Sequence, residues 1–228
     1  MAQNTSPAVM AQRIEPHDSL DYFPTPPWAV RALCEHLDTW GSIGAASCWE
    51  PACGSGDMVR ALKGYFGKVA GSDVHDYGGP DQDEVADFLF PALPALADGW
   101  PAGAPDWIIT NPPFRLAEAF ALRALELAGE GVALLVRTSF LEGIGRHERL
   151  FARFPPEWIL QFTERVPMVK GRLDGSASTA TAYCWIVWAQ PCPPGTSRAP
   201  RHPTHFPAFR WLPPCRRRLE RPGDYPEA

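Results

Sequence analysis

Several features that would place the chain in a special class are missing from its 228 residues. No apolar run approaches the roughly 18 to 20 residues that a membrane-spanning helix requires. The first twenty residues include Arg13, Glu15 and Asp18 and have no apolar segment of the kind found in secretory signals. We find no internal repeat and no Cys-x-x-Cys pair among the six cysteines. We therefore expect a cytoplasmic protein that makes no contact with a membrane and has no zinc ribbon.

A metal site is not indicated by the remaining cysteines and histidines. His202 and His205 lie between Cys192 and Cys215, but this spacing matches no ordinary zinc pattern. Cysteines scattered through an α/β domain are usually small core residues. We expect no metal ion.

The charge is unevenly distributed along the chain. Residues 191–228 contain seven arginines and three acidic residues, a net of +4, whereas the other 190 residues have a net charge of -9. An acidic body with a basic end is compatible with nucleic-acid binding but does not require it. The length suits one sizeable α/β domain and is too short for two.

Short apolar runs alternate with helical patterns along most of the sequence. Thr25 is a suitable N-cap for a first helix, with Pro26 and Pro27 in its first turn. Further strands are predicted at 46–50, 68–73, 106–110 and 132–137, with a short element at 85–89, and further helices at 58–65, 93–97, 116–128 and 146–154. This βαβ alternation predicts a mainly parallel sheet with helices on both faces.

The two ends of the chain depart from this pattern. Residues 158–169 and 179–188 are β-rich and lack an intervening helix, so we expect an antiparallel hairpin. Residues 1–20 are polar and irregular, which indicates a flexible arm. Residues 191–228 are rich in Pro and Arg without apolar periodicity, which indicates a tail. The body of the domain is therefore expected over residues 21–190.

A glycine-rich loop follows the first predicted strand, in the sequence Trp-Glu-Pro-Ala-Cys-Gly-Ser-Gly-Asp at 49–57. Gly54 and Gly56 permit a tight turn and a close approach of backbone to ligand, at the strand end where open α/β sheets bind nucleotides. The loop resembles the cofactor motif of S-adenosylmethionine-dependent methyltransferases, in the Glu-Pro-x-x-Gly-x-Gly form of the DNA amino-methyltransferases. The resemblance implies that Glu50, Pro51, Gly54 and Gly56 bind S-adenosylmethionine.

Acidic residues farther along the chain fit the same cofactor. Asp73 ends the second predicted strand, where a carboxylate can accept hydrogen bonds from both hydroxyls of a ribose. A lone Asp in this position is otherwise usually a turn residue. Asp87 can accept from the cofactor's adenine amino group, and Phe88 can pack on the adenine ring.

The strand at 106–110 runs directly into Asn111-Pro112-Pro113-Phe114. Two consecutive prolines stiffen the loop, and because Pro donates no hydrogen bond the loop presents carbonyl acceptors. The Asn111 amide oxygen and the Pro112 carbonyl can both accept from one planar NH2 group, while Phe114 can stack on a base. In isolation, the same string could equally be a proline-rich turn after a strand.

Together, the two motifs resemble N6-adenine DNA methyltransferases in which the cofactor motif precedes the catalytic one, most of all the compact phage and prophage-like type. The resemblance covers residues 20–190 and implies a Rossmann-like class I fold with seven strands and a C-terminal antiparallel hairpin. Residues 21–27 resemble the segment that folds over the methionine end of the cofactor, so Phe23 and Thr25 are expected to bind it. DNA is the implied partner, and no covalent intermediate is needed.

Two departures bear on specificity. Phe114 replaces the more frequent Tyr, which keeps the stacking surface and removes a hydroxyl. No target-recognition domain is visible, so selectivity is expected to be short or relaxed, or to come from a specificity partner or a homodimer. Candidate phosphate contacts are basic residues near the hairpin connection and in the tail: Arg165, Lys170, Arg172 and Arg216–Arg218.

Other acceptors and another class remain open. RNA adenine methyltransferases and protein glutamine methyltransferases use similar Asn-Pro-Pro motifs, because an amide also presents an NH2 group. A non-catalytic nucleic-acid-binding subunit with the same fold is the alternative of a different class. A cytosine-C5 mechanism is disfavoured, because the Pro-Cys pairs at 191–192 and 214–215 lie only in the tail.

Overall fold

The computed structural model describes residues 21–91, 104–189 and 207–225. Its strands are β1 (Ser47–Glu50), β2 (Lys68–Asp73), β3 (Glu84–Val85), β4 (Trp107–Thr110), β5 (Gly131–Arg137), β6 (Trp158–Phe162), β7 (Tyr183–Ala189) and β8 (Ala208–Leu212). Its helices are α1 (Pro27–Trp40), α2 (Asp57–Leu62), α3 (Ala117–Leu127), α4 (Ile144–Arg146) and α5 (Arg216–Leu219), with a 3-10 turn η2 (Thr138–Leu141) and a π-helical turn η3 (His147–Phe151). The predicted arm and the helix at 93–97 lie outside the described residues.

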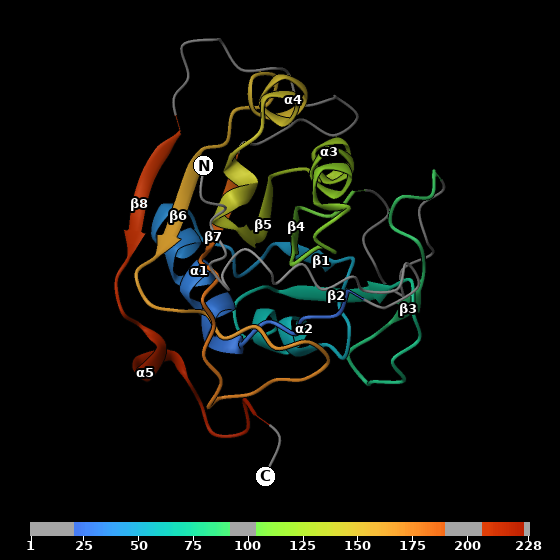
Figure 1. The fold of residues 1–228 in the computed structure, drawn as a ribbon. Coiled ribbons are helices and arrows are strands. Elements are labelled where there is room, and N and C mark those ends of the chain that lie inside the picture. Colours follow the sequence, from blue (N-terminus) through green and yellow to red (C-terminus); the bar gives the residue numbers. More distant parts are fainter. Residues whose placement is uncertain (1–20, 92–103, 190–206, 226–228) are drawn as a thin grey trace, which may run out of the picture.

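The strands form one sheet in the order β3-β2-β1-β4-β5-β7-β6-β8 (Figure 1). Strand β7 runs antiparallel to β5 and β6, and the other neighbours are parallel. The predicted mainly parallel α/β sheet and the antiparallel pairing of β6 with β7 are confirmed. The predicted number of seven strands is wrong among the described residues, because β8 adds an eighth.

Strand β8 comes from the segment that the sequence indicated to be a tail. It pairs in parallel with β6 along its whole length, from Trp158 opposite Ala208 to Phe162 opposite Leu212. Of its five residues only Leu212 is buried. Pairing with a neighbouring strand rather than burial of an apolar face therefore places β8 in the sheet, which explains why apolar periodicity did not reveal it.

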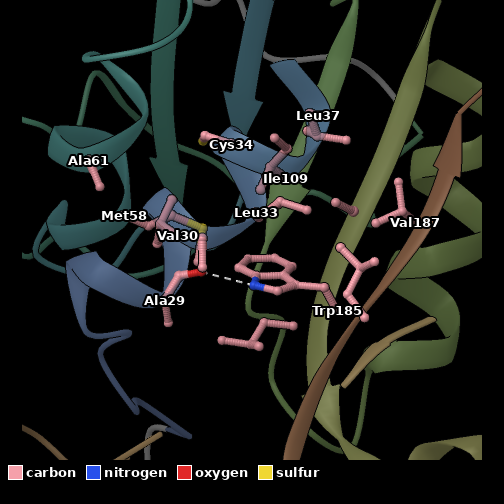
Figure 2. Packing of buried hydrophobic residues seen from close by; sticks show 14 of the residues in the cluster. Ala29, Val30, Leu33, Cys34, Leu37, Met58, Ala61, Ile109, Trp185 and Val187 are labelled. Carbon is pink, nitrogen blue, oxygen red and sulfur yellow. Dashed lines mark hydrogen bonds between the residues drawn. The ribbon is translucent and has the colours of Figure 1, made fainter. Parts of the chain in front are cut away.

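Two apolar layers cover the sheet. Helices α1, α2 and α5 pack on one face, and α3 and η3 pack on the other. In the first layer, Trp185 of β7 is fully buried under α1, and its indole N–H donates to the Ala29 carbonyl at 3.0 Å (Figure 2). This bond satisfies the polar atom of a buried indole and fixes α1 against the antiparallel end of the sheet.

Helix α1 begins at Pro27, with Pro26 in the N-cap position and no side-chain cap. The predicted role of Thr25 as N-cap is therefore wrong, and of the two prolines predicted in the first turn only Pro27 lies there. Proline suits this position because its missing N–H would have no partner in the first turn. The shift by one residue leaves Thr25 in the extended segment that precedes the helix.

The C-terminal residues after β8 fasten onto α1. Arg31 is buried and forms a bidentate ion pair with Asp224, with oxygen–nitrogen distances of 2.6 and 2.7 Å. At the surface, Arg218 makes a second bidentate pair with Glu35, at 2.7 Å for both bonds. The segment 207–225 is thus joined to the helix whose start lies beside the predicted cofactor motif.

The order of the sheet places the two sequence motifs next to each other. Strands β1 and β4 are neighbours, and the sheet grows from β1 toward β3 and from β4 toward β8. Ligands of open α/β sheets bind at such a switch point, outside the carboxyl ends of the strands. The glycine loop follows β1 and the Asn-Pro-Pro-Phe turn follows β4, so both motifs emerge at this point.

Candidate functional site

The glycine loop after β1 adopts a backbone that only glycine takes easily. Gly54 has φ +54° and Gly56 has φ +85°, both in the left-handed region. A Cβ on Gly56 would lie 2.3 Å from the Cβ of Asp81, so this position also lacks space for a side chain. The predicted tight turn is therefore present, and it directs the start of α2 away from the strand end.

Tyr22 lies across this turn. A Cβ on Gly54 would lie 2.4 Å from the Tyr22 ring, and the Tyr22 hydroxyl is 2.6 Å from Ser55 Oγ. Ser55 in turn donates to Asp57 at 2.7 Å. The Tyr22 and Tyr77 rings are 4.9 Å apart, so two aromatic side chains cover the loop that the sequence assigns to the cofactor.

Asp73 ends β2 and faces the glycine loop. Its two carboxylate oxygens accept from the Gly54 N–H at 2.9 Å and from the His75 N–H at 3.0 Å. Each oxygen retains a lone pair for a further donor. Asp73 thus holds the turn and lines the cavity beside it.

Glu50 ends β1 at the bottom of the same cavity and is only 1% exposed. Its Oε1 accepts from the Ala52 N–H at 3.1 Å, whereas Oε2 is buried and has no hydrogen-bond partner within the described residues. Burial raises the pKa of the Glu50 carboxyl to about 8, although the neighbouring Thr110 side chain and, to a smaller extent, the hydrogen bond from Ala52 oppose that change. An unpaired, buried carboxyl oxygen at a cavity is a group that awaits a donor or a cation.

The Asn111 amide is held in one orientation. Its Nδ2 donates to the Phe23 carbonyl at 2.8 Å, and its Oδ1 is buried and accepts no hydrogen bond from any described residue. Because Phe23 takes the donor, the oxygen is the end of the amide that remains free. The turn is fixed a second time by the Phe114 N–H, which donates to Asp21 Oδ2 at 2.7 Å. The segment 21–25 therefore orients the proline turn as well as covering the glycine loop.

Phe114 lies between an aromatic ring and a guanidinium. The Phe23 ring is 5.2 Å from the Phe114 ring, centroid to centroid, and Arg137 Cζ lies 3.9 Å from the Phe114 centroid. Such a cation–π contact at an exposed site contributes about 0.5–1 kcal/mol, less than the stacking of a base. Arg137 therefore rests where a planar ligand can displace it.

One cavity of about 110 Å³ connects these groups. Six of the predicted site residues line it: Phe23, Thr25, Glu50, Asp73, Asn111 and Pro113. Gly54, Gly56, Pro51, Pro112 and Phe114 lie directly beside them in the two loops. Sites that enclose a drug-sized ligand measure about 300–1,000 Å³, so we expect Tyr22 to shift when a larger molecule occupies this one.

The structure does not bring two of the predicted cofactor residues to this cavity. Phe88 is 3% exposed and packs between Trp49 and Phe120, with ring centroids 5.2 and 4.9 Å away. Asp87 is exposed and accepts from the Leu89 N–H, as a turn residue does. The ring of Phe88 is thus a core contact under β1.

The predicted phosphate contacts are spread over the surface near the β6–β7 connection. Arg165 and Arg172 are exposed, whereas Lys170 is half-buried. Arg172 pairs with Asp174 at 3.0 Å, and Arg165 donates to the Ala180 carbonyl at 3.0 Å. Of the arginines at 216–218, the first and last form ion pairs within the protein, with Glu220 and Glu35.

The sequence did not single out Tyr22, Tyr77 and Arg137 within this site. Tyr22 lies inside the quoted segment 21–27, but nothing in that string shows which ring covers the turn. Tyr77 belongs to the loop after β2, and Arg137 ends β5 next to β4. The only sequence signal for these two is their place after the carboxyl ends of parallel strands.

Cysteine and metal chemistry find no support in the described part of the chain. Cys53 lines the cavity, but burial raises the pKa of its thiol far above the usual value, so it stays protonated. Within the described residues, no group of three or more His, Cys, Asp or Glu side chains is arranged to hold a metal. The weak pattern around His202 and His205 falls outside those residues.

No family model and no curated protein matches the sequence. Among solved structures, the chain resembles the type I restriction-modification methyltransferase subunit from Streptococcus thermophilus, with a TM-score of 0.55, 14% identity and coverage of 74% of this chain and 45% of the other. The modification subunit of a predicted type I restriction enzyme from Vibrio vulnificus YJ016 gives a TM-score of 0.52, 17% identity and coverage of 75% and 45%. The chain spans less than half the length of these two subunits.

A third structure is similar over nearly its whole length. The predicted RNA methyltransferase from Pyrococcus horikoshii gives a TM-score of 0.54 with 16% identity, over 80% of this chain and 94% of the other. At these identities the likeness shows the fold, which is the Rossmann-like fold of class I methyltransferases, as predicted. None of the helices described has the length and apolarity needed to cross a bilayer.

Proposed function

We propose that the chain transfers a methyl group from S-adenosylmethionine to the N6 amino group of adenine in DNA, with short or relaxed sequence specificity. The observation that carries the proposal is the Asn111 amide, whose oxygen is a buried acceptor without a partner in the part of the chain that the structure describes. It lies beside the glycine loop because β4 and β1 are adjacent strands. The fold shared with methyltransferase subunits is consistent with this activity.

The residues at the cavity fit the cofactor. Gly54 and Gly56 allow a ligand to approach the backbone of the turn, and Asp73 retains lone pairs for ribose hydroxyls. The Glu50 carboxyl becomes a negative group for a cationic ligand when it releases its proton on binding. Phe23 and Thr25 would hold the same molecule from the side of α1. When bound, S-adenosylmethionine supplies a methyl group already activated on a sulfonium.

The Asn-Pro-Pro-Phe turn would prepare the acceptor. The lone pair of an exocyclic amino group is delocalised into the ring, which makes the nitrogen a poor nucleophile. Hydrogen bonds from this NH2 group to Asn111 Oδ1 and to the Pro112 carbonyl favour a pyramidal nitrogen with a freed lone pair. These bonds strengthen as positive charge develops on the nitrogen, so they lower the barrier rather than only binding the substrate.

Stacking on Phe114 would hold the base in the turn. Arg137 covers the ring in the absence of substrate and is exposed at the end of β5, so it can turn outward toward a phosphate when a base arrives. A base within a duplex cannot reach such a site, so it must flip out or begin unpaired. Deprotonation of a protein nucleophile is not needed, in agreement with the raised pKa of Cys53.

A radiolabel transfer assay tests the proposal. Labelled S-adenosylmethionine is incubated with the protein and matched DNA, RNA and protein acceptors, and the product nucleoside or amino acid is identified by mass spectrometry. We expect N6-methyladenine in DNA. Label in RNA adenine or in glutamine would show that the proposed acceptor is wrong and that the proposed methyl transfer to an NH2 group is right. If calorimetry detects no binding of S-adenosylmethionine, both the acceptor and the methyl transfer are wrong.

We expect Asp73→Ala to raise the dissociation constant for S-adenosylmethionine by about 10- to 100-fold. A hydrogen bond to a charged group contributes about 1.5–3 kcal/mol, and the substitution also releases the Gly54 N–H from the turn. Calorimetry measures the effect. Asp76→Ala is the matched control, because Asp76 is exposed in the same loop and accepts a hydrogen bond from the Gly78 N–H. Equal losses in the two variants would contradict the assignment.

We expect the affinity for S-adenosylmethionine to rise about tenfold or more between pH 6 and pH 8. With a pKa of about 8, Glu50 is mostly protonated below pH 8, and a cationic ligand lowers that pKa, so binding releases a proton. The contribution of Glu50 to cofactor affinity is therefore small at low pH, and it stops increasing once the pH exceeds the pKa. Glu50→Gln should bind more weakly at pH 8 and show a flatter profile. A wild-type slope retained by the Gln variant would contradict this role.

A further inference from the structure

Two large aromatic side chains are exposed on the outermost strand. Phe209 and Trp211 are 52% and 65% exposed, and their ring centroids are 4.9 Å apart in an edge-on arrangement. They are two residues apart on β8, the outermost strand in Figure 1, and the alternation of side chains along a strand therefore places them on the same face of the sheet. Adjacent aromatics left in water on a sheet face are unusual on a monomeric surface and indicate a binding site.

A hollow of about 510 Å³ lies beside these rings. Its wall is completed by polar groups from the carboxyl ends of neighbouring elements, which include Thr138, Gln161, Thr163 and Arg165. The volume falls in the range of sites that hold a small organic ligand such as a nucleoside. An apolar platform with a few polar groups suits a flat heterocycle better than an extended apolar chain.

One cationic side chain of the hollow can contact a phosphate. Arg165 is exposed and donates to the neutral Ala180 carbonyl, and no ion pair to it is present among the described residues. Glu164 also lines the hollow, and its Oε1 accepts from the Cys215 and Arg216 N–H groups at 2.5 and 2.7 Å. The acidic group is thus engaged with the backbone, while the guanidinium remains available for a phosphate.

The hollow begins one residue away from the arginine that covers Phe114. Thr138 lines it and directly follows Arg137, whose guanidinium lies 3.9 Å from the Phe114 ring. Strands β4, β5, β6 and β8 run parallel to one another, so their carboxyl ends share one edge of the sheet. A nucleic-acid strand with one base at Phe114 can therefore continue along this edge toward Trp211.

We infer that Phe209, Trp211 and Arg165 form a binding site for an unpaired nucleotide that flanks the target base. The two rings stack on the base, and Arg165 contacts a phosphate of the same strand. This mode is tolerant of sequence, because every base has a flat face. The inference rests on the proposed function, whose substrate it specifies as a strand with unpaired bases, held without a separate recognition domain.

Fluorescence anisotropy with an end-labelled single-stranded DNA oligonucleotide tests the site. We expect Phe209→Ala combined with Trp211→Ala to weaken binding by about 10- to 100-fold, whereas Trp211→Phe stays within about threefold of wild type. Trp40→Ala is the matched control, because Trp40 is 53% exposed and also meets one ring edge-on, but lies on α1. Arg165→Ala should reduce the salt dependence of binding by about 0.7 in log–log slope.

The outcomes separate this inference from the proposed function. Unchanged affinity in the double variant, with methylation by the wild type intact, would overturn the site alone. If oligonucleotide binding depends on Phe209 and Trp211 but the wild type transfers no methyl group, the site is right and the proposed activity is wrong. Light scattering measures the oligomeric state of both proteins. If the wild type is a dimer, the double variant is a monomer and the two bind the oligonucleotide equally well, the rings contact a second copy of the chain instead of a nucleotide. Unchanged cofactor affinity and melting temperature in the double variant confirm that it is folded.

Discussion

Asn111→Ala is expected to lower the turnover number for DNA methylation by about 100- to 1,000-fold. The loss of one group aimed at the charge that develops in a transition state has effects of this size. The variant should still bind S-adenosylmethionine, because Asp73, Glu50 and the glycine loop are intact. Single-turnover methylation at saturating cofactor and oligonucleotide measures the chemical step, and calorimetry measures cofactor binding. A rate within a few fold of wild type would remove Asn111 from the mechanism.

Asn111→Asp separates the two ends of the amide. An aspartate keeps an acceptor at the position of Oδ1 but places an oxygen against the Phe23 carbonyl, where Nδ2 now donates at 2.8 Å. We expect a turnover number clearly above that of the Ala variant, because the acceptor carries the rate. We also expect weaker cofactor binding than in the Ala variant, because two oxygens repel each other at the segment that lines the cavity. The reverse order of rates would assign the main role to the donor.

The parts of the site that the sequence predicted are those in which a residue type dictates the backbone. Gly54 and Gly56 have positive φ in the turn after β1, and Pro112 and Pro113 fix the turn after β4. The alternation of apolar runs and helical patterns then implies a parallel sheet, which brings both turns to one edge. These inferences use local chemistry and a chirality rule, and both are readable from a single sequence.

The remaining features depend on contacts between distant residues. Strand β8 has one buried residue in five, so its existence is decided by hydrogen bonding to β6 rather than by an apolar pattern. Phe88 follows an acidic residue as expected of a cofactor contact, yet Trp49 and Phe120 enclose its ring. The position of Tyr22 over Gly54 is a choice among neighbouring aromatics that only packing resolves.

Asp224→Ala is expected to lower the free energy of unfolding by about 3–5 kcal/mol. Arg31 is 6% exposed, and its guanidinium now donates to Asp224 and to the Leu219 carbonyl. After the substitution, the Leu219 carbonyl is the one of these acceptors that remains. An uncompensated charge in the interior has a cost of this size, larger than the value of the pair itself. Urea unfolding followed by circular dichroism measures the change. A loss below about 1 kcal/mol would show that water or another group replaces the carboxylate.

Glu35→Ala provides the control, because the Glu35–Arg218 pair joins the same two segments at the surface. Exposed pairs contribute about 0–1 kcal/mol, so a small loss there would locate the effect of Asp224 in burial rather than in the connection between segments. The pH dependence of stability tests the role of the Asp224 carboxylate further. Burial alone would raise the pKa of Asp224, but the hydrogen bonds from Arg31 and the Arg221 N–H outweigh it, and the pKa is lowered.

Because the pKa of Asp224 is lowered in the folded state, its carboxylate stabilises the fold at pH values above the ordinary pKa of aspartate, near 4. This stabilisation is lost as the pH falls through the pKa that Asp224 has in the folded protein. The difference in unfolding free energy between the wild type and Asp224→Ala should therefore be constant from about pH 5 to 7 and should narrow below about pH 4. Arg31 remains charged throughout, so the narrowing reports the carboxylate alone. A difference that stayed constant down to pH 3 would mean that the lost contact is packing rather than charge.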